Sequence, residues 1–169
     1  ELVRIASHLI AVGTYAMDIG AVTPFPYALR EREYINDLME IMTGARLTYN
    51  CARIGGVSRD VDDNFFKKLE EFLDHFEPII DEYNRLFSFN KILIERTANI
   101  GVITKEEAIS YSLVGPNLRA SGVKWDLRKD EPYLVYDELD FDVPVGTGMF
   151  GTVGDSFDRY WVRIEEMRQ

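Results

Sequence analysis

The sequence contains little cysteine or histidine and no long hydrophobic run free of charges. Its single cysteine, Cys51, excludes an internal disulfide framework and a zinc or iron–sulfur site built from cysteines of this chain. Neither a signal peptide nor a clean apolar stretch of about 20 residues is present. The sequence therefore predicts no metal centre within the chain.

An excess of positive charge is absent too. The 29 acidic residues outnumber the 19 basic residues, which gives a net charge of −10. Binding to nucleic acid or to an anionic membrane surface depends on clustered lysine and arginine, so neither is expected. With 169 residues, of which 46% are hydrophobic, the chain can bury the core of one globular domain.

Several catalytic signatures are missing as well. The chain has no Ser/His/Asp set, no His-Glu-x-x-His motif, no cysteine pair and no internal repeat. The glycines of residues 146–154 predict a flexible loop, but neither a Lys-Ser/Thr pair nor a strand–loop–helix pattern accompanies them. A nucleotide site is therefore not expected there.

Hydrophobic periodicity predicts a mainly α-helical fold. The expected helices cover residues 1–22, 28–42, 59–87, 104–112 and 155–169. Residues 23–26, Thr-Pro-Phe-Pro, are expected to form an extended turn, and Pro78 to kink or split the third helix. Alternating hydrophobicity near residues 133–145 predicts a short β element. Both ends of the chain lie inside helical periodicity without caps, which is typical of a single piece of a larger domain, truncated at both ends.

The first helix combines an apolar surface with one polar stripe. At about 100° per residue, a stripe about 100° wide contains five polar side chains: Glu1, Arg4, His8, Tyr15 and Asp18. Polar groups buried in a bundle need partners. One interpretation is an internal seam of salt bridges and hydrogen bonds. The other is a cavity wall in which Asp18 or His8 exchanges protons, because burial readily shifts the pKa of carboxylates and histidines.

Two irregular segments are basic. Residues 43–57, here called the arginine segment, contain Arg46 and Arg53 and no acidic residue, which predicts a site facing an anion or an electron-rich group. Residues 114–133, here called the second basic segment, contain four basic residues among turn-forming residues: Arg119, Lys124, Arg128 and Lys129. A long irregular segment of this kind is usually functional or packed against a partner.

Two further charged features are expected to lie in solvent. The alternating charges of residues 30–33 are typical of a solvated first helical turn. His75 lies among acidic neighbours without a second ligand at helical spacing, so it is interpreted as a surface histidine.

Six separated stretches resemble one known family. They are ELVRIASHL, DIGAVTPF, REREYINDLMEIMTGARLTYNCARIGGV, LRASGVKWDLRK, FDVPVG and GDSFDRYWVRIEEMRQ. Nearly collinearly over all 169 residues, they resemble the quinone-proximal large hydrophilic subunit of NADH–quinone oxidoreductase (complex I), known as the 49 kDa subunit. The resemblance implies a helical bundle core of the fold shared with the large subunit of nickel–iron hydrogenases, without the metal-binding cysteine pairs.

The resemblance also implies a function. In this family the subunit and a smaller neighbour build the pocket where quinone, the substrate, receives electrons from the neighbour's [4Fe–4S] cluster, and electron transfer is coupled to ion translocation. NADH, FMN and the cluster are bound by other subunits, a membrane arm anchors the complex, and the subunit is peripheral on the cytoplasmic side of the bacterial inner membrane. Two alternatives remain open: the large subunit of a membrane-bound nickel–iron hydrogenase, and a purely structural domain that holds subunits together.

Family residues transfer to four positions. Asp18 matches a carboxylate that partners a quinone-contacting histidine from an upstream loop. Arg46 and Arg53 match residues lying toward the cluster-bearing subunit. Thr48 occupies a position where many relatives carry a histidine thought to couple protonation to cluster reduction, so this coupling is doubtful here. The chain by itself is expected to be inactive.

Overall fold

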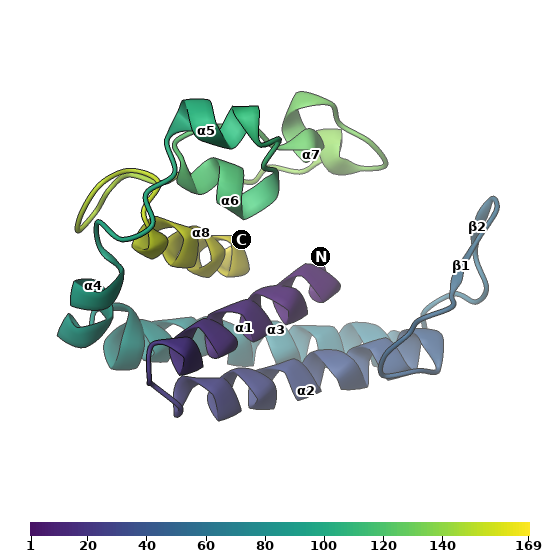
Figure 1. Cartoon of the computed structure of the whole chain (residues 1–169). Helices are drawn as coiled ribbons and strands as arrows, with labels where there is room; N and C mark the ends of the chain where they lie inside the picture. Colours follow the sequence, from purple (N-terminus) through teal and green to yellow (C-terminus); the bar gives the residue numbers. More distant parts are fainter. The chain divides into compact units, whose positions relative to one another are not determined.

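The computed structural model describes residues 1–169 and divides into two compact units, residues 1–82 and residues 83–169. Figure 1 shows the helices and strands in chain order. Helices form most of both units, and the only sheet has two short strands. The predicted mainly α-helical fold with a short β element is therefore confirmed, although the β element lies elsewhere in the chain.

The first unit begins with a pair of packed helices, α1 (Leu2–Asp18) and α2 (Pro24–Thr43). Their shared core consists of small and aliphatic side chains: Ala6, Leu9, Val12 and Ala16 from α1, with Ala28, Ile35, Leu38 and Met39 from α2. The helices approach closely at Gly13, where a Cβ atom would lie 3.1 Å from the Cβ of Ala28 and 3.1 Å from the Cδ2 of Phe25. A side chain at this crossing would therefore have to displace these neighbours by a few tenths of an ångström.

The prolines between α1 and α2 begin a helix instead of forming an extended turn. Pro24 is the first residue of α2, and Pro26 lies in the same first turn. Backbone N–H groups of a first turn have no intrahelical acceptor, so proline loses nothing there. The prediction of an extended Thr-Pro-Phe-Pro turn is wrong for this reason. At the other end, Gly44 adopts φ 82° and ends α2, as its position predicts.

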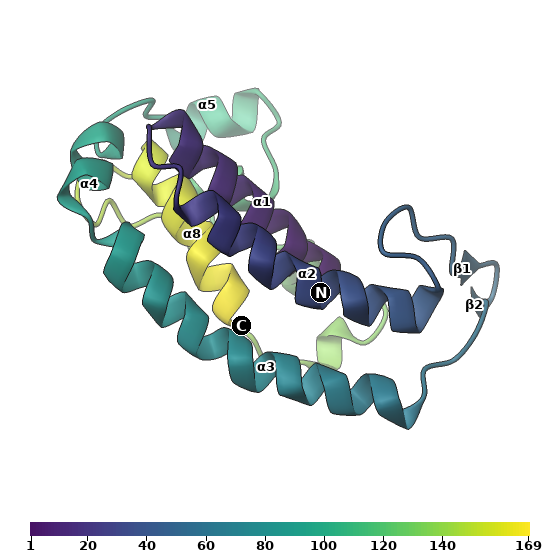
Figure 2. The same cartoon turned by 90° about the horizontal axis from the view of Figure 1, so that it is seen from below.

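The third helix, α3 (Asp63–Tyr83), runs antiparallel to α2 (Figures 1 and 2). Asp62 caps it by accepting a hydrogen bond from the backbone N–H of Phe65 at 2.9 Å. Pro78 lies inside the helix without splitting it. In the second unit the chain continues into a π-helical turn, η1 (Asn84–Ser88).

The two strands lie in the arginine segment. Strands β1 (Ala52–Arg53) and β2 (Gly56–Val57) pair antiparallel, with Ala52 opposite Val57 and Arg53 opposite Gly56. Residues 133–145 contain no strand, only a short 3-10 helix, η2 (Tyr136–Glu138). Alternating hydrophobicity was insufficient there because no neighbouring strand is available for pairing. Instead, the ring of Phe141 packs against Tyr136 and beneath the guanidinium of Arg128.

The second unit consists of short helices packed around a longer C-terminal helix. These are α4 (Lys91–Thr97), α5 (Lys105–Ser110), α6 (Gly115–Ala120), α7 (Leu127–Asp130) and α8 (Ser156–Arg168). Helix α8 packs against α4 and α6, and it buries the aromatic and aliphatic face that its periodicity predicts. Thr104 and Glu107 form a capping box at the start of α5, which confirms the helix expected from residue 104.

The glycines of residues 146–154 allow close backbone packing. A Cβ atom at Gly146 would lie 1.9 Å from the carbonyl oxygen of Ala120, and one at Gly154 would lie 2.2 Å from that of Ile103. Neither position has room for a side chain. The predicted flexible loop is instead a closely packed turn, because its glycines allow the backbone to pack directly against other backbone segments.

No helix of the structure combines the length and the apolar character that a membrane span requires.

Candidate functional site

Asp18 is the last residue of α1, and its carboxylate is exposed. It forms no ion pair within the chain. His8 lies half-buried on the same helix, while the buried face of α1 is formed by Ala6, Leu9, Val12, Gly13 and Ala16. Arg4 is also exposed, at 3.3 Å from Glu1. The stripe faces away from the contact with α2, so the expectation that it is buried is wrong for its charged residues, whereas the Glu1–Arg4 pair agrees with the ion-pair interpretation.

Arg46 is surrounded by carboxylates of α2. Its guanidinium donates hydrogen bonds to Glu33 and Asp37, and to the Oε2 of Glu40 at 3.1 Å. The three acidic residues are spaced by four and three positions, so they share one exposed face of the helix. Hydrogen bonds to Asp37, Glu40 and Glu33 raise the pKa of Arg46 above its usual value. Although residues 43–57 contain no acidic residue, the preceding helix supplies three carboxylates to Arg46.

Arg53 has only neutral partners. Its Nη1 donates to the Oδ1 of Asn50 at 2.9 Å and to the backbone carbonyls of Asn50 and Ala52 at 3.0 and 2.8 Å. The residue is exposed in the hairpin, next to the exposed side chain of Ile54. No acidic residue of the chain balances this charge through a direct bond.

Thr48 lies between the two arginines in an unusual backbone conformation. Its φ angle is 55°, in the left-handed region that a β-branched residue rarely adopts. The side chain is exposed, and its hydroxyl donates to the carbonyl of Leu47 at 2.7 Å. Backbone strain of this kind occurs at functional turns, so it marks this turn as a candidate contact region.

Sequence reasoning missed a buried carboxylate on α2. Glu31 is fully buried, and its Oε1 accepts from the Nε of Arg30 at 2.5 Å. Its Oε2 lies 2.8 Å from the Nε2 of His75 on α3. The prediction of a solvated charge run at residues 30–33 is therefore wrong for Glu31, although Arg30 and Glu33 are exposed. His75, interpreted as a surface histidine, is 40% exposed but also contacts this buried carboxylate. A signal existed, because Glu31 follows Ala28 by three positions and precedes Ile35 by four, which places it on the buried face.

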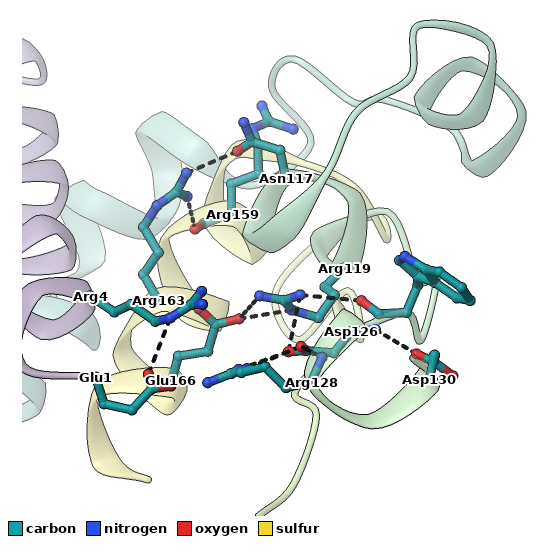
Figure 3. A network of polar contacts seen from close by, with 11 residues as sticks. Glu1, Arg4, Asn117, Arg119, Asp126, Arg128, Asp130, Arg159, Arg163 and Glu166 are labelled. Carbon is teal, nitrogen blue, oxygen red and sulfur yellow. Dashed lines mark hydrogen bonds and ion pairs between the residues drawn. The ribbon is translucent and has the colours of Figure 1, made fainter. Parts of the chain in front are cut away.

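The second basic segment is folded around its own ion pairs (Figure 3). Arg119 of α6 is 5% exposed. Its Nε and Nη2 donate to the Oε1 of Glu166 on α8 at 2.8 and 2.5 Å, and its Nη1 lies 3.4 Å from the Oδ2 of Asp126. The charge of Arg119 is therefore compensated by carboxylates inside the second unit.

Asp126 links Arg119 to Arg128. The Nε and Nη2 of Arg128 donate to the two carboxylate oxygens of Asp126 at 3.0 and 2.7 Å (Figure 3). Burial alone would raise the pKa of Asp126, but the hydrogen bonds from Arg128 and the charges of Arg128 and Arg119 outweigh burial and lower it. The expectation of a long irregular basic loop is thus wrong, since the segment contains α6, α7 and a nearly buried ion-pair network.

Two buried aspartates at the start of α8 have no such compensation. Asp155 caps the helix by accepting from the N–H of Asp158 at 2.9 Å. Asp158 accepts from the N–H groups of Gly148 and Gly154 at 3.0 and 3.2 Å. Burial raises the pKa of Asp158, even though these backbone hydrogen bonds act to lower it. Both aspartates hold the glycine-rich turn of residues 146–154.

Nowhere do three or more potential metal-ligating side chains come together. Arg46, Thr48 and Arg53 share one segment, whereas Asp18 and His8 lie on α1. The structure therefore contains two candidate regions in the first unit, one at the end of α1 and one in the arginine segment.

Comparison with known proteins gives one consistent family. The family model described as respiratory-chain NADH dehydrogenase, 49 Kd subunit, matches residues 18–169. The chain is 62% identical over all 169 residues to a D-type subunit of NADH-quinone oxidoreductase from Sorangium cellulosum, of which it covers 44%. It is 54% identical to the D-type subunit from Methylacidiphilum infernorum and 52% identical to that from Bacillus cereus, covering 39% and 45% of those proteins and the whole of this chain. The chain spans less than half the length of these relatives.

Proposed function

The chain belongs to the family of 49 kDa subunits of respiratory-chain NADH dehydrogenase, and from this premise we propose that it is part of the quinone-proximal subunit of an NADH–quinone oxidoreductase. The observation that carries the proposal is identity of up to 62% along the entire chain to proteins named for that reaction. The same names favour this function over that of a hydrogenase large subunit.

In this proposal the chain contributes one part of the quinone pocket and binds no cofactor itself. NADH, FMN and the [4Fe–4S] cluster are held by other subunits, and a membrane arm couples electron transfer to ion translocation. The subunit associates peripherally with the cytoplasmic side of the inner membrane. Its partners are the cluster-bearing small subunit and other subunits of the complex.

Asp18 is proposed to support proton transfer at the quinone pocket. Its carboxylate is exposed and has no ion partner in the chain, so it is accessible to a histidine supplied by another part of the complete protein. His8 is ten positions earlier on the same helix, about 15 Å away at 1.5 Å per residue. His8 therefore cannot pair directly with Asp18, and any proton role of His8 is separate.

The arginine segment is proposed to face the neighbouring cluster. Arg53 has only neutral partners, so its positive charge is suited to stabilise a reduced cluster and raise its potential. Three carboxylates surround Arg46, which weakens its field at a distance. Thr48 has no group that titrates near neutral pH, so redox-linked protonation is not expected from this position.

The test of the Asp18 role is Asp18→Asn in the assembled complex, which keeps the size of the side chain and removes its charge. We expect quinone reduction to fall while the amount of assembled complex and NADH oxidation by an artificial acceptor are unchanged. Asp74→Asn is the matched control, because Asp74 is an exposed carboxylate on α3. The control variant should retain full quinone reduction.

Two results would contradict the proposal. Normal quinone reduction by the Asp18→Asn complex would remove Asp18 from the proton chemistry. Failure of this variant to assemble, beside normal assembly of Asp74→Asn, would favour a purely structural role at a subunit interface.

A further inference from the structure

We propose that Glu31 and His75 act as positioning residues, forming a polar clamp that sets α2 against α3 and thereby sets where the arginine segment points. The inference rests on the proposed function, in which that segment faces the neighbouring [4Fe–4S] cluster. Neither residue is assigned to the quinone or proton chemistry above.

The burial of Glu31 is the first argument. Its side chain is fully buried, and removing a carboxylate from water is strongly unfavourable unless donors replace the lost hydration. Arg30 donates at 2.5 Å and His75 lies at 2.8 Å, so both oxygens are satisfied. An apolar side chain would fill the site without such donors. Only Glu31 is buried, since the side chain of His75 is 40% exposed, so the contact joins a buried acceptor on α2 to a half-exposed donor on α3.

The second argument is the position of Glu31 and His75 along their helices. Glu31 lies 12 positions before Thr43, the last residue of α2, and His75 lies 12 positions after Asp63, the first residue of α3. At 1.5 Å per residue, each is about 18 Å from the end of its helix. Because the helices are antiparallel, this equal spacing brings the two ends that flank the arginine segment to the same level (Figure 2).

Two further interactions between α2 and α3 lie close to the Glu31–His75 contact. The ring of Tyr34, one turn after Glu31, lies 5.0 Å from the ring of His75. Arg30 interacts electrostatically with Glu82, which is two turns after His75. A shift of α3 along α2 would break the Glu31–His75 contact and separate the rings of Tyr34 and His75.

Sliding would be transmitted to the arginine segment because it is fixed at both ends. Arg46 binds the carboxylates of α2, and residues 58–62 join the segment to α3, whose first turn Asp62 caps. A shift of α3 along α2 therefore moves the hairpin that contains Arg53 relative to Arg46. Loss of the clamp should thus change the distance between the Arg53 charge and the group it faces.

The experiment compares His75→Leu with His75→Gln in the purified complex. Leucine removes the Nε2 donor, whereas the side-chain amide of glutamine keeps a donor for Glu31. The measurement is the midpoint potential of the neighbouring [4Fe–4S] cluster, from a redox titration followed by electron paramagnetic resonance. Arg53→Gln serves as the reference for loss of the charge itself, and Asp74→Asn as the surface control.

We expect Arg53→Gln to lower the midpoint potential and His75→Leu to lower it by a smaller amount. His75→Gln and Asp74→Asn should leave the potential unchanged. If Arg53→Gln lowers the potential but His75→Leu does not, the clamp is overturned and the proposed function stands. If Arg53→Gln has no effect, the proposed orientation of the segment fails instead.

A second variant covers the case in which His75→Leu does not assemble. Should His75→Leu fail to assemble, the double variant Glu31→Leu with His75→Leu removes the uncompensated buried carboxylate. A lowered potential in the assembled double variant supports positioning, and an unchanged potential overturns it. Failure of the double variant to assemble also overturns the proposal, because the pair is then required for folding.

Discussion

The arginine segment and the second basic segment look alike in sequence but differ in how their charges are balanced. Both contain arginines among glycines and turn-forming residues. In the arginine segment, Arg46 binds exposed carboxylates of the preceding helix, and Arg53 binds only neutral groups. In the second basic segment, Arg119 is buried between Asp126 and Glu166.

The difference teaches that local composition does not give the electrostatic environment of a side chain. The carboxylates around Arg46 come from 6 to 13 positions earlier, and Glu166 is 47 positions from Arg119. Among the arginines of these two segments, Arg53 is the one that no carboxylate of the chain binds. The second basic segment uses its charges to hold its own fold.

The largest expected effect is on Arg119. Arg119→Met removes the cation while keeping much of the side-chain volume, and it leaves the carboxylates of Glu166 and Asp126 without that partner. Breaking a buried ion pair by removing one partner costs about 3–5 kcal/mol. Chemical denaturation followed by circular dichroism should show this loss in the free energy of unfolding.

Arg53→Met is the matched control in the arginine segment. Substitution of an exposed residue with only local partners should change the free energy of unfolding by no more than about 0.5 kcal/mol. Equal losses in the two variants would contradict the distinction between a structural and an available arginine.

A smaller effect concerns pH and separates two carboxylates of the second unit. Asp126, beside Arg128 and Arg119, has a lowered pKa, so its contribution to stability is lost as pH falls through that lowered pKa. The pKa of Asp158 is raised by burial, so the folded state holds a proton more tightly than the unfolded chain and stability is lost as pH rises through the raised pKa.

Melting temperatures of Asp126→Asn and Asp158→Asn, measured against the wild type between about pH 2 and pH 7, should reveal the two signs. The advantage of the wild type over Asp126→Asn should grow as pH rises. The melting temperature of the wild type relative to that of Asp158→Asn should fall as pH rises over the same range. Parallel curves for the two variants would show that arginine compensation does not set the pH response of Asp126.

Much of the fold follows from local signals in the sequence. The capping box of Thr104 and Glu107, the Asp62 cap and the helix-ending Gly44 depend on neighbours within a few residues, and all are present. The prediction of a strand near residues 133–145 was wrong because strand pairing depends on distant parts of the chain. The prediction of a flexible loop at residues 146–154 was wrong for a related reason: its glycines allow close packing against the backbone carbonyls of Ala120 and Ile103, which lie far away in the sequence.

The candidate site was less predictable than the fold. Family resemblance selected Asp18 and the arginine segment, and the roles of these residues remain proposals. The sequence analysis assigned Glu31 to a solvated turn, although helical spacing could have placed it on the buried face of α2. Only the fold brings His75 to it from 44 positions away. Partners at such separations are not encoded in any short pattern.

The smallest expected effect is that of replacing Arg46, whose ion pairs in the arginine segment are exposed. Arg46→Gln removes three surface ion pairs, each of which is solvated and screened by salt. At low ionic strength we expect a small loss of thermal stability. The loss should disappear near 1 M salt, where the screening length falls to about 3 Å. Since the buried pairs of Arg119 are screened much less, the loss in Arg119→Met should persist in the same titration. A salt-independent loss in Arg46→Gln would mean that Arg46, like Arg119, holds the fold through buried contacts.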